Sequence, residues 1–238
     1  MDDGWNKSAQ AWIASQGEAG DWTRLHVLDG PMLARIDAGA FRTALDVGCG
    51  EGRFCRMLAA RGIATTGIDP TAALIRAARE RHPQGLYRVA SAEALPFADM
   101  SFDLVVSYLS LIDIAGLSAA IREMARVLRP GGTLLIANLT SFSTASAAPN
   151  MGWARGPEGE RLHFAIDDYL ESRARRVGWA GIAIDNHHRP LSVYMGLLIA
   201  AGLRLAHFDE PRADDADPAR KAIYDRVPYA FLMEWRKD

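Results

Sequence analysis

The feature that most constrains this chain is a glycine pattern that directly follows a short apolar segment. In TALDVGCGEGRF, residues 43–54, the apolar segment carries Asp46, and Gly48, Gly50 and Gly52 then occupy alternate positions. Glycine has no Cβ, so three glycines leave one side of a loop bare and let a ligand lie against the backbone. The helix that would begin behind the loop offers free N–H groups to an anion. The segment therefore predicts a strand, a ligand-binding loop and a helix, in that order.

Short β-prone segments alternate with helical segments further along the chain. The periodicity predicts strands over 43–47, 64–68, 85–90, 102–107 and 133–138, and helices over 52–62, 71–83 and 117–132. The last of these helices has Ile121, Met124, Ala125 and Leu128 on one face, and Pro130 and Gly131 end it. Strands that alternate with helices of this length predict right-handed βαβ units and a mostly parallel sheet, which is an α/β fold.

The rhythm divides the chain into four expected regions. An N-terminal helical lid spans 1–40, an α/β core that binds the ligand spans 41–139, an inserted cap over the substrate site spans 140–188, and the C-terminal part of the core spans 189–238. That last part predicts a helix over 190–202 and an antiparallel pair of strands, 203–210 and 226–237, joined by a polar loop over 211–225. The basic run at 171–176 is interpreted as a solvated helix face.

Composition excludes several classes of function. The chain has 27 Lys and Arg against 29 Asp and Glu, a formal charge of -2, so no global charge attracts nucleic acid or anionic lipid. No secretory signal and no membrane span are visible, which predicts a cytoplasmic protein without a membrane partner. The two cysteines, Cys49 and Cys55, are too few for a disulfide framework or a zinc site. We expect reduced, packed thiols and no metal.

A carboxylate follows the second predicted strand. Asp69 lies about 20 residues beyond the glycine loop, where an acid accepts hydrogen bonds from ribose hydroxyls. A nicotinamide dinucleotide site usually has the pattern G-x-G-x-x-G, but Arg53 stands where its third glycine belongs. The departure at Arg53 weakens the case for a nicotinamide cofactor. The loop and the carboxylate together predict a nucleoside site without fixing the rest of the ligand.

The chain resembles the class I S-adenosylmethionine-dependent methyltransferases, especially the small-molecule type related to the ubiquinone and menaquinone biosynthesis enzymes. The resemblance rests on LDVGCGEGRF, GIDP, AEALPFADMSFDLVVSYLSL and VLRPGGTLLIA, which occur in the family's order and spacing. It implies a Rossmann-like sheet of seven strands in which the last strand is antiparallel. It also implies S-adenosyl-L-methionine as cofactor and S-adenosyl-L-homocysteine as product.

The resemblance further implies roles for individual residues. The backbone of the glycine loop would line the methionyl part of the cofactor, Asp46 would orient its amino group, and Asp69 would hold both ribose hydroxyls. Ile68 or Pro70 would flank the adenine. Many members have Asp where this chain has Ser91, so Ser91, the Ala92 backbone and Glu93 would serve the adenine by weaker contacts. The full cofactor set is Asp46, Gly48, Cys49, Gly50, Asp69, Pro70, Ser91, Ala92, Glu93, Ser107 and, as a partner of the cofactor carboxylate, Arg24.

Methyl transfer asks for few protein groups, because the sulfonium already carries an activated methyl and needs only an in-line nucleophile. A phenol would gain from a base, and the candidates are His187, His188 and His163, with Asp113 as a fourth. Each histidine has an alternative role at the surface or at a helix start. Tyr108, Trp153 and Phe164 are the candidate substrate contacts, and with Trp12, Trp22, Trp179 and Phe142 the aromatic residues either close over an acceptor or pack the cap on the sheet.

Three functions remain open on the sequence. The leading one is S-adenosylmethionine-dependent methyl transfer to a small organic acceptor through an oxygen or nitrogen nucleophile. A second is an RNA or protein methyltransferase on the same fold, which predicts an open, basic groove. A third is a module that binds the cofactor without catalysis, because the reaction requires no particular side chain.

Overall fold

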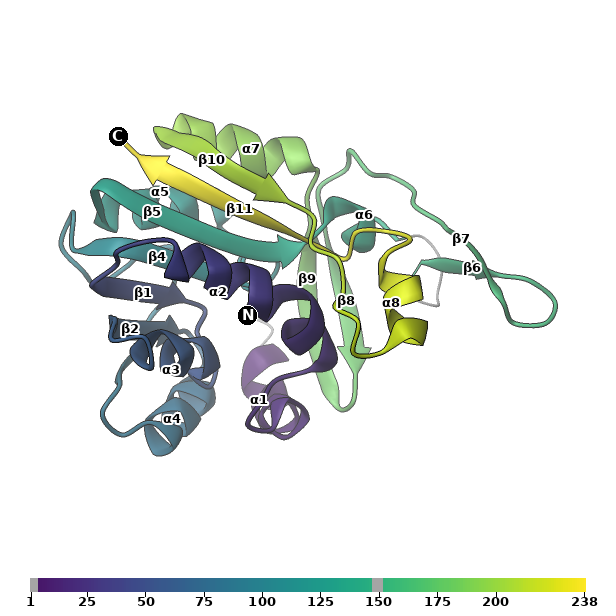
Figure 1. Ribbon diagram of the computed structural model, residues 1–238, viewed down its shortest axis with the longest axis horizontal. Helices are drawn as coiled ribbons and strands as arrows, with labels where there is room; N and C mark the ends of the chain where they lie inside the picture. Colours follow the sequence, from purple (N-terminus) through teal and green to yellow (C-terminus); the bar gives the residue numbers. More distant parts are fainter. Residues whose placement is uncertain (1–3, 147–151) are drawn as a thin grey trace.

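A seven-stranded sheet forms the centre of the computed structural model, which describes residues 4–146 and 152–238. The strands follow the order β10-β11-β5-β4-β1-β2-β3 (Figure 1). Only β11 is antiparallel to its neighbours β5 and β10. The α/β fold, the mostly parallel sheet and the antiparallel last strand are therefore confirmed. The strands are β1 (Thr43–Val47), β2 (Ala64–Asp69), β3 (Leu86–Val89), β4 (Phe102–Tyr108), β5 (Leu128–Leu139), β10 (Leu203–Asp209) and β11 (Ala230–Lys237).

Helices cover both faces of this sheet because its central strands are apolar on both sides. In β4, Val105 packs toward α5 (Leu117–Val127) and α7 (Leu191–Ala200), whereas Leu104 and Val106 pack toward α2 (Asp29–Asp37) and α3 (Arg53–Ala59). The apolar face predicted for α5 is buried in the first of these two cores, but the helix ends at Val127, and Leu128 already belongs to β5 instead of continuing the predicted helix to residue 132. α4 (Ala72–Arg81) packs on β2 and β3.

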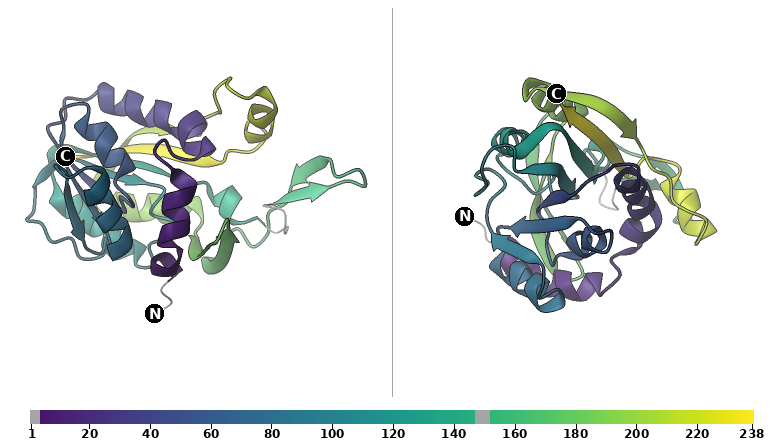
Figure 2. Two further views of the ribbon diagram at one scale, coloured as in Figure 1. Left: turned by 90° about the horizontal axis from the view of Figure 1, so that it is seen from below. Right: turned by 60° about the vertical axis from the view of Figure 1, so that its left-hand side comes forward.

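The segment 140–188 consists mainly of two antiparallel hairpins beside the sheet. After α6 (Ser141–Thr144), β6 (Trp153–Arg155) pairs with β7 (Arg161–Phe164), and β8 (Arg173–Trp179) pairs with β9 (Ile182–His188). The prediction of a helix face at 171–176 is wrong, since residues 173–176 pair with β9 and alternate in burial as a strand does. The β6–β7 hairpin projects from the body (Figures 1 and 2). Residues 147–151 of the expected cap lie outside the described residues.

The polar segment 211–225 contains a helix that the sequence interpretation missed. α8 (Pro218–Tyr224) begins after Asp217, whose side chain accepts hydrogen bonds from the backbone N–H groups of Ala219 and Arg220. An acidic cap followed by proline is a standard start signal, so the loop prediction over these residues was avoidable.

The N-terminal helices border the carboxyl ends of the strands. α1 (Gly4–Gln16) packs against β9 and α4, and η1 (Arg24–Leu28) leads into α2. In Figure 2, α1 crosses the molecule between the α4 side of the sheet and the β8–β9 hairpin. Residues 1–3 of the expected lid lie outside the described residues.

Candidate functional site

The loop between β1 and α3 has a left-handed backbone at each of its three glycines. The φ angles of Gly48, Gly50 and Gly52 are 77°, 55° and 79°. A Cβ on Gly48 would lie 2.4 Å from the Cβ of Ser110, and one on Gly52 would lie 2.8 Å from the Tyr87 ring, so the protein itself occupies the space at these two positions. A Cβ on Gly50 would lie 3.6 Å from Trp12 Nε1 of α1, which is an ordinary contact distance. The bare backbone is therefore at Gly50, beneath α1.

Asp69 closes the other side of this loop. One carboxylate oxygen accepts a hydrogen bond from Gly50 N–H at 3.1 Å, and the other accepts from Thr71 N–H at 2.8 Å. Burial raises the pKa of Asp69, and these two N–H donors oppose the shift. Each oxygen retains lone pairs for a further donor, such as a hydroxyl.

Asp46, at the end of β1, is almost completely buried. Its Oδ2 accepts a hydrogen bond from Cys55 Sγ at 3.3 Å, while its Oδ1 has no partner among the described residues. Burial raises the pKa of Asp46 to about 7, and the charges of Asp69 and Glu51 add to this effect. A buried carboxylate oxygen without a donor is costly, so this position suits a cationic N–H group from a ligand.

Ser91 and Glu93 form a small polar group after β3. The Ser91 hydroxyl donates to the Glu93 carboxylate, which also accepts from Gly116 N–H at 3.2 Å. Burial alone would raise the pKa of Glu93, but these hydrogen bonds lower it. Ala92 is buried between them, whereas Pro70 is exposed.

Ser107 and Tyr108, at the end of β4, both bind protein groups. Ser107 Oγ lies 2.7 Å from Ser110 Oγ and is fully buried. The Tyr108 hydroxyl donates to Asp29 Oδ1 at 2.8 Å, and burial raises its pKa. Asp29 also pairs with Arg53 of α3.

Arg24 begins η1, between α1 and α2 of the N-terminal region. Its guanidinium pairs with Asp21 and stands 4.9 Å from the Trp12 ring centre and 5.8 Å from that of Tyr108. The structure thus brings Arg24, Trp12 and Tyr108 together above the strand ends.

The three candidate histidines do not come together. His188 is buried, with Nδ1 2.7 Å from Thr144 Oγ1 and Nε2 2.9 Å from the Tyr169 carbonyl oxygen. Because both ring nitrogens bind protein groups, the role of His188 in this structure is to hold these segments together and not to act as a base. His163 is exposed on β7 of the projecting hairpin. His187 is half-buried, with a pKa lowered by burial and by Arg189, and strand alternation turns it to the opposite face of β9 from Asn186.

Asp113, the fourth candidate base, lies in the loop after β4 and contacts β9. Asn186 Nδ2 of β9 donates to Asp113 Oδ1 at 2.6 Å, and both residues keep some accessible surface. Two further contacts fasten the same loop. His187 N–H donates to the Ile112 carbonyl at 2.7 Å, and the Arg189 guanidinium donates to the carbonyls of residues 111, 114 and 115. Sequence reasoning missed Asn186 and Arg189, because no local pattern marks a contact between distant segments.

Trp153 and Phe164 pack against each other in the projecting hairpin. Their ring centres are 5.4 Å apart, and Arg226 covers Trp153 at 4.6 Å. Among the other aromatic residues, Phe142 and Trp179 are exposed, while Trp22 packs on Tyr224 and His26.

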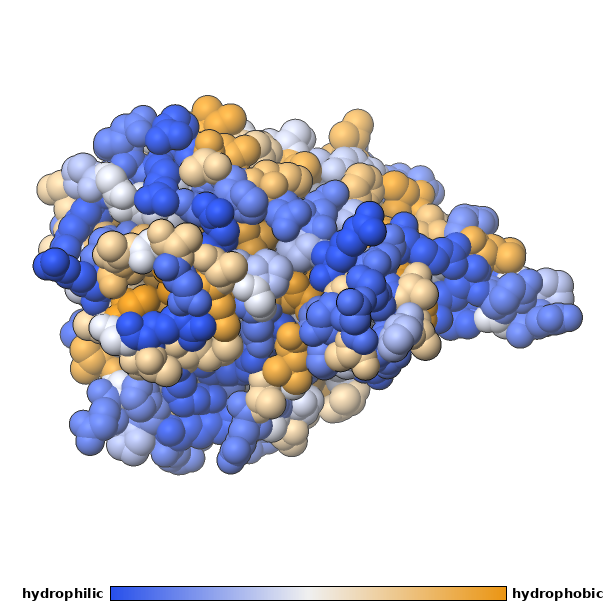
Figure 3. Space-filling view, viewed as in Figure 1, coloured by the Kyte–Doolittle hydropathy of each residue, from blue (hydrophilic) through white to orange (hydrophobic). Residues whose placement is uncertain are grey.

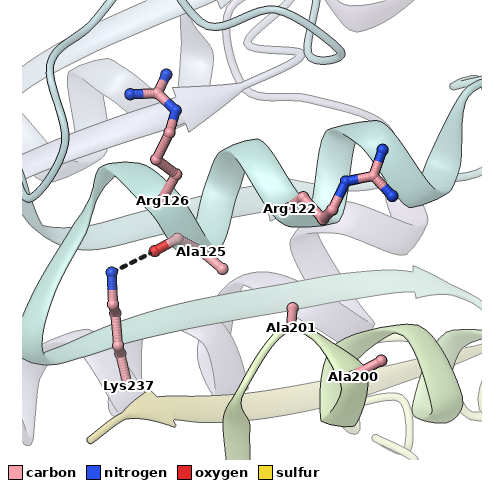
Figure 4. A pocket seen from close by; sticks show the side chains of 6 residues that line it. All are labelled: Arg122, Ala125, Arg126, Ala200, Ala201 and Lys237. Atoms are coloured by element: carbon pink, nitrogen blue, oxygen red, sulfur yellow. Dashed lines mark hydrogen bonds between the residues drawn. The ribbon is translucent and has the colours of Figure 1, made fainter.

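Two surface hollows lie at the opposite edge of the sheet, where the strands begin. One, of about 330 Å³, is lined by Arg122, Ala125, Arg126, Ala200, Ala201 and Lys237 (Figure 4). Its cations already have protein partners, since Lys237 donates to the carbonyls of Ala125 and Leu128, and Arg126 pairs with Asp99 and Glu123. The other, of about 270 Å³, lies beside Phe41 and Arg61. Neither offers reactive chemistry.

In residues 4–146 and 152–238 no group of three or more His, Cys, Asp or Glu side chains is arranged to hold a metal ion. No helix in this part of the chain has the length and apolar character needed to cross a membrane.

Known proteins resemble the chain over most of its length. A family model described as a methyltransferase domain matches residues 45–136. The malonyl-[acyl-carrier protein] O-methyltransferase of Enterobacter lignolyticus is 30% identical over 187 residues, which are 76% of this chain and 72% of that protein. The protein of the same name from Erwinia pyrifoliae is 41% identical over 119 residues, 49% of this chain and 45% of that protein. A crystal structure of an S-adenosylmethionine-dependent methyltransferase from Mesorhizobium loti is 28% identical, with a TM-score of 0.77, and the match covers 87% of this chain and 96% of that one.

Proposed function

This chain belongs to the S-adenosylmethionine-dependent methyltransferases, and we propose that it methylates an oxygen atom, in a hydroxyl or carboxyl group, of a small acceptor. Bound S-adenosylmethionine supplies a methyl group on a sulfonium, which an in-line nucleophile displaces. The protein's part is to bind the cofactor, align the acceptor and exclude water.

The residues around the glycine loop fit this cofactor. The unpartnered Oδ1 of buried Asp46 suits the ammonium of its methionyl part. The free lone pairs of Asp69 suit ribose hydroxyls, and the bare backbone at Gly50 permits close approach. Arg24, next to Trp12, suits the carboxylate, and the Ser91–Glu93 group, which follows β3, suits polar contacts with the adenine.

The proposal of a small acceptor rests on one observation: α1 and β9 border the carboxyl ends of the strands. α1 covers Gly50 through Trp12 and is fastened to β9 by Ser8, which exchanges hydrogen bonds with the Ala183 backbone. β9 is in turn fastened to the loop after β4 by Asn186. An acceptor must fit inside this frame or reach into it on a narrow arm. In Figure 3 the projecting hairpin is mostly hydrophilic. The net charge of the chain is -2, so its overall charge does not favour RNA.

Oxygen as the acceptor atom is supported by the relatives, which are named O-methyltransferases of malonyl-[acyl-carrier protein]. We therefore rank a carboxyl group on an acyl thioester and an acidic hydroxyl as the first acceptors to test. The test uses methyl-labelled S-adenosylmethionine with matched panels of hydroxyl, carboxyl and amine compounds, followed by mass spectrometry of the products. Methylation of amines alone, or calorimetric binding of NADH in preference to S-adenosylhomocysteine, would contradict the proposal.

A further inference from the structure

Asp113 is a titratable side chain beside the cofactor loop that no local motif identifies. Its loop begins at Ser110, whose side chain occupies the space in front of Gly48 and whose hydroxyl donates to the Val47 carbonyl at 2.6 Å. One turn later, Asp113 N–H donates to the Ser110 carbonyl at 3.0 Å. The carboxyl group of Asp113 therefore stands one turn away from the strand end that carries the glycine loop.

The orientation of Asp113 is fixed from the cap. Asn186 donates to Oδ1 at 2.6 Å, whereas no described residue donates to Oδ2. One oxygen is therefore held by Asn186, the other has no donor among the described residues, and the residue as a whole keeps some accessible surface. This is the arrangement expected of a base that is oriented by a neighbouring amide.

We propose, building on the proposed function, that Asp113 is the catalytic base for a hydroxyl acceptor such as a phenol or enol, and that Asn186 is its positioning residue. The acceptor O–H gives its proton to Asp113 Oδ2. Its oxygen forms a bond to the methyl carbon as the carbon–sulfur bond breaks, and that electron pair remains on sulfur. The proton then passes from Asp113 to water.

The charges around Asp113 agree with this role. Burial raises the pKa of Asp113 to about 8, the Asn186 hydrogen bond and the Arg24 charge lower it, and the Asp69 charge raises it. Burial raises the pKa of Tyr194 in α7, and the charge of Asp113 adds to this effect, whereas Arg189 and the hydrogen bond from Asn138 oppose it. A base with a pKa near the working pH is effective against a hydroxyl whose pKa is near 10.

The experiment compares wild type with Asp113→Asn, Asn186→Ala and the control Asp185→Asn, which changes an acid on the other face of β9. For Asp113→Asn we expect S-adenosylhomocysteine affinity within twofold of wild type by calorimetry, and a kcat for hydroxyl acceptors lower by about 100-fold or more. Its residual rate should rise with pH as the acceptor itself ionises. Asn186→Ala should move the acid limb of the kcat–pH profile upward by about one unit, because a hydrogen bond that favours the charged form is lost.

Three results would overturn the proposal. One is a kcat of Asp113→Asn within threefold of wild type, and a second is an acid limb that does not move in Asn186→Ala. The third is wild-type turnover of carboxyl acceptors but not of hydroxyl acceptors, which would leave the proposed function intact. If wild type methylates no oxygen in any panel, the proposed function fails as well.

Discussion

The carboxyl group of Asp46 should make cofactor binding depend on pH. Its pKa of about 7 in the free protein means that it is largely protonated in mild acid. The ammonium of S-adenosylmethionine favours the ionised form, so below pH 7 binding must first remove a proton. We expect affinity to fall by up to about tenfold per pH unit below that point, measured by calorimetry between pH 5.5 and 8.5. In Asp46→Asn, affinity should be lower at every pH and this dependence should vanish.

The same group affects stability with a definite sign. Because its pKa is higher in the native state than the ordinary value of 3.8, ionisation disfavours the native state, and its cost to stability grows as pH rises from about 4 to 7. Without cofactor, the free energy of unfolding of Asp46→Asn should therefore fall less than that of wild type between about pH 4 and 7, as measured by urea denaturation. An equal loss in both proteins would contradict the assignment.

Asp69 should be the side chain on which nucleoside binding depends most. We expect Asp69→Ala to weaken S-adenosylhomocysteine binding by about 1.5–3 kcal/mol, the usual effect of losing hydrogen bonds to a charged group. Asp103→Ala is the matched control, since Asp103 also accepts backbone N–H bonds, from Arg42 and Thr43, but at the far edge of the sheet. It should lower stability and leave affinity unchanged. Equal affinities for the two variants would refute the ribose assignment.

The roles of residues that belong to a local sequence motif could be predicted. The roles of residues that depend on contacts between distant segments could not. The glycine loop and the two acids, Asp46 and Asp69, follow from the strand–loop–helix order, and both acids lie in the last residues of β1 and β2. Asp113 was only a fourth candidate, because its partner Asn186 is 73 residues away and on a strand whose pairing the sequence does not reveal. His188 resembled a base for the same reason: the Tyr169 carbonyl and Thr144 that bind its ring have no sequence signature.

At the scale of elements, α1 should control access to the cofactor loop. Ser8 Oγ accepts a hydrogen bond from Ala183 N–H at 3.0 Å and donates to the Ala183 carbonyl at 3.2 Å. Removing both bonds in Ser8→Ala should loosen α1 and speed release of S-adenosylhomocysteine by up to roughly 30-fold, since about 1 kcal/mol is lost for each of the two bonds. Stopped-flow release and hydrogen exchange of residues 4–16 measure the two effects.

Ser15→Ala provides the control in the same helix. Ser15 is exposed, and its hydroxyl donates to the Trp12 carbonyl within α1. We expect release and exchange to match wild type. If Ser8→Ala behaves like Ser15→Ala, the attachment of α1 to β9 does not gate the site.

The core elements were more predictable than the cap because burial on two faces leaves a strong periodicity. β4 and β5 alternate between the two apolar cores, and α5 presents one apolar face. In the cap, by contrast, β8 contains three arginines, and this charge pattern concealed a strand whose partner is β9. Tertiary pairing there overrides local preference.

At the scale of the whole molecule, the cofactor should act as a global stabiliser. A ligand at 100 times its Kd adds about 2.7 kcal/mol to the free energy of unfolding. For a chain of this size that corresponds to a rise in Tm of roughly 5–10 °C. We expect it with S-adenosylmethionine and S-adenosylhomocysteine, and no rise with NADH, by differential scanning fluorimetry. Stabilisation by NADH alone would exclude the family's cofactor.

The position of β11 between β5 and β10 has a consequence for synthesis on the ribosome. Strands β1 to β5 can assemble while the chain is still growing, but β10 emerges before the strand that must separate it from β5. Until residues 230–237 leave the exit tunnel, the nascent sheet keeps an unpaired edge at β5, and β10 waits for a neighbour. Chaperones that shield exposed strand edges can bind the chain during the interval between the emergence of β5 and that of β11.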